Sequence, residues 1–344
     1  MALEVQSECT GCGARLRYSP EHSALECDRC GIRRAIEDPA GGEVGVFDFE
    51  KALADPERLR PAREIFPDGQ ETRCERCGAR TVLAGQSGSC PYCGAPVLLE
   101  AESDDLLSPD SMSPFAIDRA QAKSAAASWA RGLWFAPRSF HRKIREGDLE
   151  GVYLPYWCFN WHSRTYYGGQ SGDKSPWDGE IRWTPTGGSV DFNFEDILII
   201  ATSSVPASLV SKCGPWSYHR LRPFDASYLL GFSAERYDRH LEKAFRSVRL
   251  AQTERIRLAV RADIFGERAK IEWMDIVNDS IEFRLCLLPF WIGSFSVRGR
   301  VHRVLVHGET GRVAGERPLS SRKLGAVALG LAAAAVLFFW MVLS

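Results

Sequence analysis

Eight cysteines fall in four CxxCG units, and this pattern constrains the fold of the N-terminal part of the chain. Two thiolates in one such unit can bind a single tetrahedral ion from a tight turn, and the glycine that follows permits the positive φ of that turn. Fourteen residues separate the first two units, twelve separate the last two, and forty-three separate the two pairs. The candidate ligands are Cys9, Cys12, Cys27, Cys30, Cys74, Cys77, Cys90 and Cys93.

Pairing neighbouring units predicts two small β modules, each a ribbon with one four-cysteine site, over residues 1–45 and 70–100. The long middle gap argues against an interleaved arrangement, and the CxxC spacing argues against disulfides. We therefore predict two Zn²⁺ ions, one per site. Iron is the minor alternative, because the second module resembles a rubredoxin-type pair of knuckles. Segment 46–69 is expected to be a linker.

The C-terminal segment 324–343 contains no charged residue and no proline. A helix of that length, rising about 1.5 Å per residue, spans roughly 30 Å, the thickness of a hydrocarbon core. Seven Arg or Lys against two Glu lie between Ser296 and Lys323, and such positive flanks mark the cytoplasmic side. The pattern predicts a transmembrane helix that anchors a single-pass, tail-anchored protein in the bacterial cytoplasmic membrane, with the bulk of the chain in the cytoplasm. A buried core helix is the alternative.

Charge argues against nucleic acid as the main partner. The chain has a net charge of −1, and its first hundred residues hold 12 basic and 17 acidic side chains. A zinc ion bound by four thiolates adds further negative charge, whereas phosphate binding requires a positive field. Local arginine clusters at Arg15/Arg17 and Arg29/Arg33/Arg34 keep a nucleic-acid-binding regulator as the alternative function.

Residues 117–320 predict an α+β domain, preceded by an acidic, Ser- and Pro-rich linker at 101–116. Asp118 followed by Gln121 is typical of a capping box at the start of a helix. Residues 152–169 alternate as a strand with one buried face, and 190–201 form a second candidate strand. We expect Ser233 to cap a long helix over 234–262, and we expect separate strands at 270–277, 280–288, 290–297 and 300–307.

Two similar phrases lie in this domain, LPYW at 154–157 and LPFW at 288–291. Each follows helical sequence and opens a strand rich in aromatic residues. The similarity of the two phrases could reflect a weak internal duplication or chance reuse of a short phrase. The predicted architecture is thus multidomain: two four-cysteine zinc ribbons, a central α+β domain with a weak duplication, and one C-terminal transmembrane helix.

Catalytic motifs are not found in the sequence. No phosphate loop, GxSxG, HExxH or GxGxxG motif at a strand–helix junction is present. Cys158 and His162 could form a nucleophile pair, but no third group orients them, so a polar strand face is the simpler interpretation. Cys158, Cys213 and Cys286 are predicted to be small core residues. We predict no enzyme activity, no catalytic or cofactor-binding residue, and no small-molecule substrate.

The whole chain resembles a bacterial family of tail-anchored double zinc-ribbon proteins. The resemblance rests on the paired cysteine units and on WFAP (134–137), GVYLPYW (151–157), RWTP (182–185), LLGFSAERYD (229–238), LLPFW (287–291) and VHGETGRVAGERPLS (306–320). Members often carry labels taken from transcription-factor-B ribbons or from the primosomal helicase. Helicase activity is rejected because the chain has no ATPase motif.

The resemblance implies a role in membrane-stress systems that include flotillin-like (SPFH) or phage-shock-type proteins. Only the eight paired cysteines carry over as site residues. The expected function is a cytoplasm-facing scaffold that recruits protein partners to the membrane. A membrane-tethered nucleic-acid-binding regulator is the first alternative, and an unrecognised enzyme or iron-containing electron carrier is the second.

Overall fold

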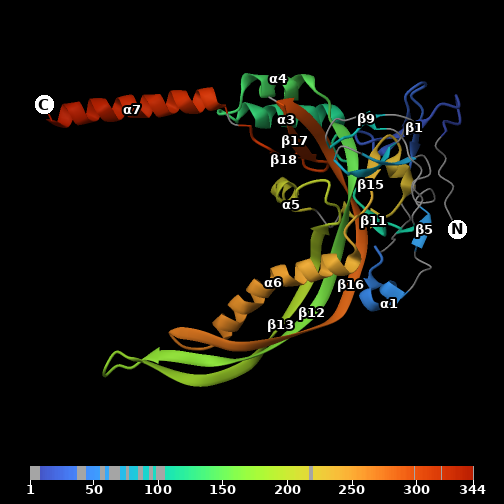
Figure 1. Ribbon diagram of the computed structural model, residues 1–344. Helices are drawn as coiled ribbons and strands as arrows, with labels where there is room; N and C mark the ends of the chain where they lie inside the picture. Colours follow the sequence, from blue (N-terminus) through green and yellow to red (C-terminus); the bar gives the residue numbers. More distant parts are fainter. Residues whose placement is uncertain are drawn as a thin grey trace.

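The computed structural model describes residues 8–36, 44–54, 59–61, 70–74, 77–83, 88–92, 96–97, 105–216, 220–297, 299–318 and 320–343. Three long strands form the centre of the fold: β12 (Glu150–Lys174), β13 (Ile181–Ile200) and β16 (Arg268–Val297). They pair antiparallel with β12 in the middle. Together they leave the body as a curved arm that ends at the β12–β13 turn (Figure 1).

The separate strands expected between 270 and 297 are one continuous strand. β16 keeps its pairing with β12 across a register shift between Asn160 and His162, and Ser280 takes a φ of 50° opposite that shift. A bulge of this kind bends a strand and increases its twist without ending it. The arm is therefore long and curved where the sequence suggested several short strands.

Shorter strands extend this sheet on both sides. β17 (Arg300–His307) and β18 (Val313–Gly315) follow β16 as a meander, and β11 (Ser111–Met112) pairs in parallel with β16. Within the described residues the sheet has eleven strands. Its other members are β4 (Phe47–Asp48), β6 (Gln70–Arg73), β7 (Arg80–Leu83), β14 (Arg222–Pro223) and β15 (Ser233–Glu235).

The segment expected as a linker at 46–69 carries regular elements instead. It contains β4, the helix α1 (Phe49–Ala54) and β5 (Leu59–Pro61). Phe47 pairs with Phe283 on β16, and the ring of Phe49 lies 5.1 Å from that of Phe245. This segment packs on the domain because two of its aromatic side chains bury themselves against an apolar surface there.

The acidic segment at 101–116 also packs on the domain rather than serving only as a linker. β10 (Asp105–Leu107) pairs with β5, and β11 lies against β16. Ser111 and Phe115 are buried, and the Asp110 carboxylate accepts a hydrogen bond from the backbone N–H of Leu285 at 2.7 Å. The polar residues of this segment thus satisfy backbone groups at the edge of β16.

Helices cover the sheet. α3 (Arg119–Arg131) begins with the predicted capping box, in which Asp118 and Gln121 exchange two hydrogen bonds. α4 (Arg138–Glu146) follows it, and α6 (Leu241–Asp263) packs on the arm. α6 begins at Leu241 instead of the expected 234, because Ser233–Glu235 pairs with β12 and β7 as β15. The short helices are α5 (Ala207–Val210), η2 (Ser211–Cys213) and η4 (Ala226–Leu229).

β12 has the single buried face that the alternation predicted only beyond Phe159, because both of its faces are buried from Gly151 to Phe159. Trp157, Phe159 and Trp161 belong to the buried cluster beneath α6, whereas Cys158 belongs to a different cluster on the opposite face of β12. The two similar phrases meet only at their first residues, where Leu154 pairs with Leu288, and they run in opposite directions from that pair because the strands are antiparallel. Their origin by duplication stays a prediction.

The final helix, α7 (Ser321–Leu343), extends away from the body on the same side as the arm (Figure 1). Many of its side chains, including those of Leu324, Ala326 and Ala328, lie outside the described residues. Counted over the residues that are described, no helix combines the length and apolarity needed to cross a membrane.

Candidate metal centres

The first cysteine cluster brings together all four predicted ligands. Cys9 Sγ lies 3.5 Å from Cys30 Sγ, and Cys12 Sγ lies 3.5 Å from Cys27 Sγ. All four sulfurs lie within 4.8 Å of one another. A tetrahedral zinc centre with Zn–S bonds near 2.3 Å separates its sulfurs by about 3.8 Å, so the cluster matches such a site in ligand type, number and spacing.

Tight turns position these cysteines. Gly13 and Gly31 take φ of 69° and 72°, and their N–H groups donate to the carbonyls of Cys9 and Cys27, both at 2.9 Å. Gly78 repeats this geometry in the second ribbon, with φ of 74° and a hydrogen bond of 2.7 Å to Cys74 O. The predicted role of glycine is thus confirmed in three knuckles, and Gly94 lies outside the described residues.

The electrostatics of the first cluster favour a bound cation. The backbone N–H groups of Cys30 and Arg29 lower the pKa of the Cys27 thiol to about 6. A backbone hydrogen bond from Ile32 lowers the pKa of Cys30, but burial and its cysteine neighbours raise it overall, to about 12. Crowded thiols therefore cannot all ionise by themselves, and a bound dication would supply the missing positive charge.

The second cluster contains three of its four predicted ligands. The sulfurs of Cys74, Cys77 and Cys90 lie within 4.8 Å of one another, and Cys77 Sγ is 3.6 Å from Cys90 Sγ. Cys93 lies outside the described residues. Clusters of four and three cysteines are compatible with zinc-ribbon-like sites, and the identity and number of the ions stay predictions.

Ribbon 1, built from β1 (Leu16–Ser19), β2 (Ala24–Cys27) and β3 (Arg33–Ala35), packs on the α+β domain. Tyr18 carries this contact. Its hydroxyl donates to Phe115 O at 3.2 Å, its N–H donates to Leu230 O at 2.9 Å, and its ring meets that of Tyr228 at 5.0 Å. The ribbon therefore shares a buried core with the domain.

Ribbon 2 joins the domain through its strands. It contains β6, β7, β8 (Gly88–Ser89) and β9 (Pro96–Val97), and β7 pairs with β15. The carbonyl of Tyr92 accepts from Arg303 Nε at 3.1 Å, and that of Pro91 accepts from Ser294 Oγ at 3.0 Å. These contacts tie the knuckle around Cys90 to β16 and β17.

A buried carboxyl group lies beneath ribbon 2. The Tyr92 hydroxyl donates to Glu235, and Thr202 Oγ1 donates to the other carboxyl oxygen at 2.6 Å. Burial is the largest influence and raises the pKa of Glu235 to about 7, against the hydrogen bonds of Ser204, Thr202 and Tyr92, which lower it. Sequence reasoning missed this pair; its only signals were an aromatic residue inside CPYCG and an acid inside the mainly apolar LLGFSAERYD phrase.

The Glu235→Gln variant should flatten the dependence of stability on pH. Because the folded-state pKa of Glu235 lies above its ordinary value of 4.5, the folded chain binds more protons than the unfolded chain between about pH 4.5 and 7. Stability therefore falls as pH rises through that window, by about 3 kcal/mol. Glutamine has nearly the same shape and is neutral at every pH, so the variant does not lose stability as pH rises through this window.

Urea unfolding at pH 5 and pH 8 measures this effect. We expect the advantage of Glu235→Gln over the native chain to be larger at pH 8 than at pH 5. Glu316→Gln is the control, because Glu316 accepts a backbone hydrogen bond from Arg303 but is only partly buried. An equal difference at the two pH values would show that Glu235 does not carry the effect.

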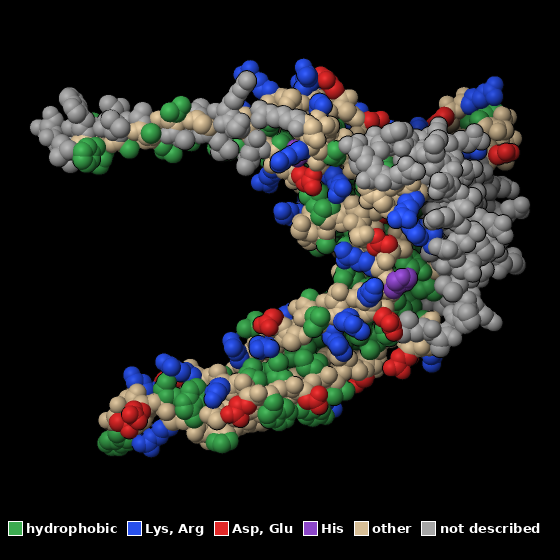
Figure 2. Space-filling view, viewed as in Figure 1, with side chains coloured by type: hydrophobic (Ala, Val, Ile, Leu, Met, Phe, Trp, Pro, Cys, Tyr) green, Lys and Arg blue, Asp and Glu red, His purple; other side chains and the backbone are tan. Residues whose placement is uncertain are grey.

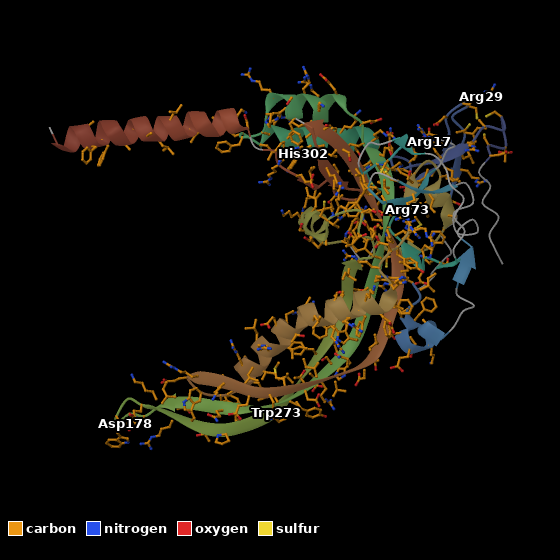
Figure 3. All side chains as sticks on the ribbon, viewed as in Figure 1. Arg17, Arg29, Arg73, Asp178, Trp273 and His302 are labelled. Atoms are coloured by element: carbon orange, nitrogen blue, oxygen red, sulfur yellow. The ribbon has the colours of Figure 1, made fainter. Side chains whose placement is uncertain are left out.

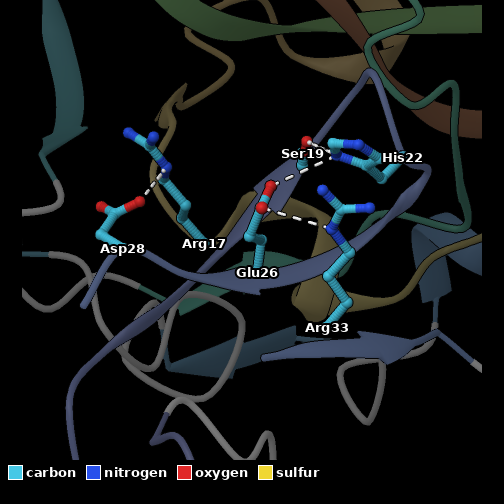
Figure 4. Close-up of polar contacts among 6 residues, drawn as sticks. All are labelled: Arg17, Ser19, His22, Glu26, Asp28 and Arg33. Atoms are coloured by element: carbon cyan, nitrogen blue, oxygen red, sulfur yellow. Dashed lines mark hydrogen bonds and ion pairs between the residues drawn. The ribbon is translucent and has the colours of Figure 1, made fainter. Parts of the chain in front are cut away.

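Acidic side chains form ion pairs with arginines of ribbon 1 (Figure 4). Arg17 Nε lies 2.7 Å from Asp28, and Arg33 Nε lies 3.3 Å from Glu26. Burial tends to raise the pKa of Glu26, but Arg33 and His22 lower it overall. These pairs reduce the positive field that a nucleic-acid surface would need.

The three remaining cysteines are buried, as predicted. A hydrogen bond to Cys286 and burial raise the pKa of Cys158 far above its ordinary value, so this thiol is inert. His162 lies between two carboxylates instead, 3.0 Å from Asp279 and 3.2 Å from Asp191. His162 thus lies on a polar part of the strand face, whereas Cys158 is part of the buried core.

Comparison with known proteins gives one informative similarity. No protein-family model matches the chain, and no solved structure matches it. The chain is similar to a Bacillus subtilis (strain 168) protein whose description is "Uncharacterized protein YdjG". The two are 24% identical over 336 residues, which cover 95% of this chain and 94% of the relative. The similarity therefore extends over most of the chain and is not confined to one of its parts.

Proposed function

We propose that the chain is a membrane-anchored adaptor that holds protein partners at the cytoplasmic face of a bacterial membrane. The exposure of α7 carries this proposal. Leu329, Leu331, Phe338, Phe339 and Met341 are 66–75% exposed, and the 324–343 segment has no charge along its whole length. A helix that is apolar on every face is stable only when a membrane or another protein covers it.

The ribbons are the proposed recruitment module. Both are held against the domain, so a partner would meet a rigid surface and pay little ordering entropy. The tip of ribbon 1 remains accessible: Ile32 is 43% exposed, beside the exposed Arg29 and Cys30. Anchoring in two dimensions raises the effective concentration of even a weakly bound partner.

The partner class comes from the family resemblance and is part of the proposal. Flotillin-like or phage-shock-type proteins are the expected partners, and the absence of enzyme activity stays a prediction. A nucleic-acid-binding regulator is not favoured, since acids pair with Arg17 and Arg33 at the surface of ribbon 1.

A comparison of membrane fractions tests the adaptor. In cells with the full chain, a defined set of otherwise soluble proteins should sediment with membranes, and deletion of 324–343 should return that set to the soluble fraction. Replacing 324–343 with an unrelated single-pass helix is the matched control, and it should restore recruitment. If no soluble protein changes fraction between the full chain and the deletion, the adaptor proposal is wrong.

A further inference from the structure

A long stretch without acidic residues forms one corner of the domain. From Arg119 to Arg145 the chain contains no Asp or Glu, and this stretch forms α3, α4 and the loop between them. The Asp148 carboxylate forms ion pairs with Arg119 and Lys123, at N–O distances of 3.0 Å and 3.2 Å. The cations that remain exposed are Arg131, Arg138, Arg142, Lys143 and Arg145.

α4 presents most of these cations on its outer face. Phe140 and Ile144 are buried against the domain, so Arg138, Arg142 and Arg145 point outward. The nearest acid, Glu146, lies 3.9 Å from Arg142 and 4.0 Å from Arg145, with all three side chains more than 60% exposed. Glu146 offsets one of these charges, so the face formed by Arg138, Arg142, Lys143 and Arg145 keeps a net positive charge. Figure 2 shows Lys and Arg side chains gathered over this corner, beside the start of α7.

The loop between α3 and α4 exposes two aromatic side chains. Trp134 is 76% exposed and Phe135 is 38% exposed, next to the basic face of α4. Exposed aromatic residues beside exposed arginines are typical of segments that lie in a membrane interface, where the ring enters the headgroup layer and the cations meet lipid phosphates.

Hydrogen bonds join this loop to the first turn of α7. Lys323 Nζ donates to Trp134 O at 2.6 Å and to Ala136 O at 3.0 Å, and the N–H of Ser320 donates to Phe135 O at 2.8 Å. The uncharged segment begins one residue after Lys323. Once that segment is inserted, these contacts hold Trp134 at the level of the lipid headgroups.

We infer that the α3–α4 corner is a lipid-binding surface, with Trp134 inserted among anionic phospholipid headgroups and the arginines at the start of α4 facing their phosphates. The inference rests on the proposed function, because the anchor brings this corner to the bilayer. Nucleic acid also presents a surface of phosphates to a basic protein. Lipid is the favoured partner because Trp134 is exposed and its loop is attached to the start of α7.

Photo-crosslinking of the full chain in vesicles tests the inference. Trp134→benzoylphenylalanine should crosslink to lipid in phosphatidylcholine vesicles that contain phosphatidylglycerol. Ile32→benzoylphenylalanine should not, because ribbon 1 lies on the opposite side of the body from α7 (Figure 1). Adding Arg138→Gln and Arg142→Gln should lower the ratio of docked to undocked protein about 30-fold, because each cation contributes a factor of about five.

A matched pair of substitutions controls for loss of charge alone. Arg15→Gln with Arg29→Gln removes the same charge from ribbon 1, where Figure 3 shows Arg29 far from α7, and should leave the crosslinking unchanged.

Resistance to alkaline extraction reports the insertion of α7 separately. Insertion without a lipid crosslink at position 134 overturns this inference and leaves the anchor intact, whereas failure of insertion overturns the proposed anchor itself. If the same arginines instead retain single-stranded DNA and position 134 gives no lipid crosslink, the surface binds nucleic acid and the lipid inference is wrong.

Discussion

Replacing Cys27 with Ser should abolish metal retention by ribbon 1 and separate residues 8–36 from the domain. The ribbon has only short strands and a small core of its own, so a bound ion would supply most of its folding free energy. Structural zinc sites in isolated modules contribute about 10–16 kcal/mol of apparent binding free energy. A loss of this size is similar to the total stability of a typical domain, about 5–15 kcal/mol.

The expected loss extends beyond the ribbon. Tyr18, Leu25 and Cys27 belong to the same buried cluster as Phe115 and Leu230 of the domain. When the ribbon unfolds, the Tyr18 hydrogen bonds to Phe115 and Leu230 are lost, and the surface beneath them becomes exposed to water. The unfolded ribbon should then be cleaved rapidly by a protease, while α6 and the arm remain protected.

Metal analysis and limited proteolysis of the purified chain measure this outcome. Cys27→Ser should retain one ion fewer per chain than the native protein, and cleavage should concentrate within 8–36. Cys213→Ser is the control, because Cys213 is equally buried and lies outside both cysteine clusters. Unchanged metal content in Cys27→Ser would refute a four-cysteine site. A colourless zinc-containing protein would also remove the iron alternative, which requires visible thiolate absorption.

The second large effect concerns α7. Ala334→Arg with Ala335→Arg should release the chain from the membrane into the soluble fraction. Both positions lie near the middle of 324–343, and an arginine at the centre of a membrane span costs about 2.5–3.5 kcal/mol on insertion scales. Two such residues in one short helix remove most of the favourable free energy of inserting it.

Alkaline extraction followed by sedimentation measures the fraction that remains in the membrane. Ala334→Leu with Ala335→Leu changes the same positions without adding charge and should stay membrane-integrated. If the arginine variant also resists extraction, α7 does not cross the bilayer. In that case another protein covers its apolar surface.

Local patterns in the sequence predicted the metal clusters well. A CxxCG unit closes a turn within a few residues, so its geometry depends on the glycine and not on distant contacts. Gly13, Gly31 and Gly78 all have the expected positive φ, and the predicted ligands converge in both clusters except for Cys93, which is not described. The capping box at Asp118 and the alternation that places Trp157 beneath α6 also depend only on residues close in the sequence.

Expectations failed where pairing between distant segments decided the structure. Ser233–Glu235 has helix-compatible sequence, yet it forms a strand because β12 and β7 offer free edges on either side. Phe47 and Phe115 turn supposed linkers into parts of the core, since their rings find apolar surfaces contributed by residues far away in the chain. Periodicity within a short window carries no information about such partners.

The sequence by itself thus determined the cysteine clusters, the turns that hold them, and the apolar character of the 324–343 segment, because each depends mainly on residues close in the chain. Only the tertiary structure decided that the ribbons are fixed to the domain, that Glu235 is buried beneath Tyr92, and that Trp134 lies at the root of α7. These features arise when strands and loops separated by a hundred residues or more are brought into contact. Their free energy comes from burial and hydrogen bonds that exist only in the folded chain.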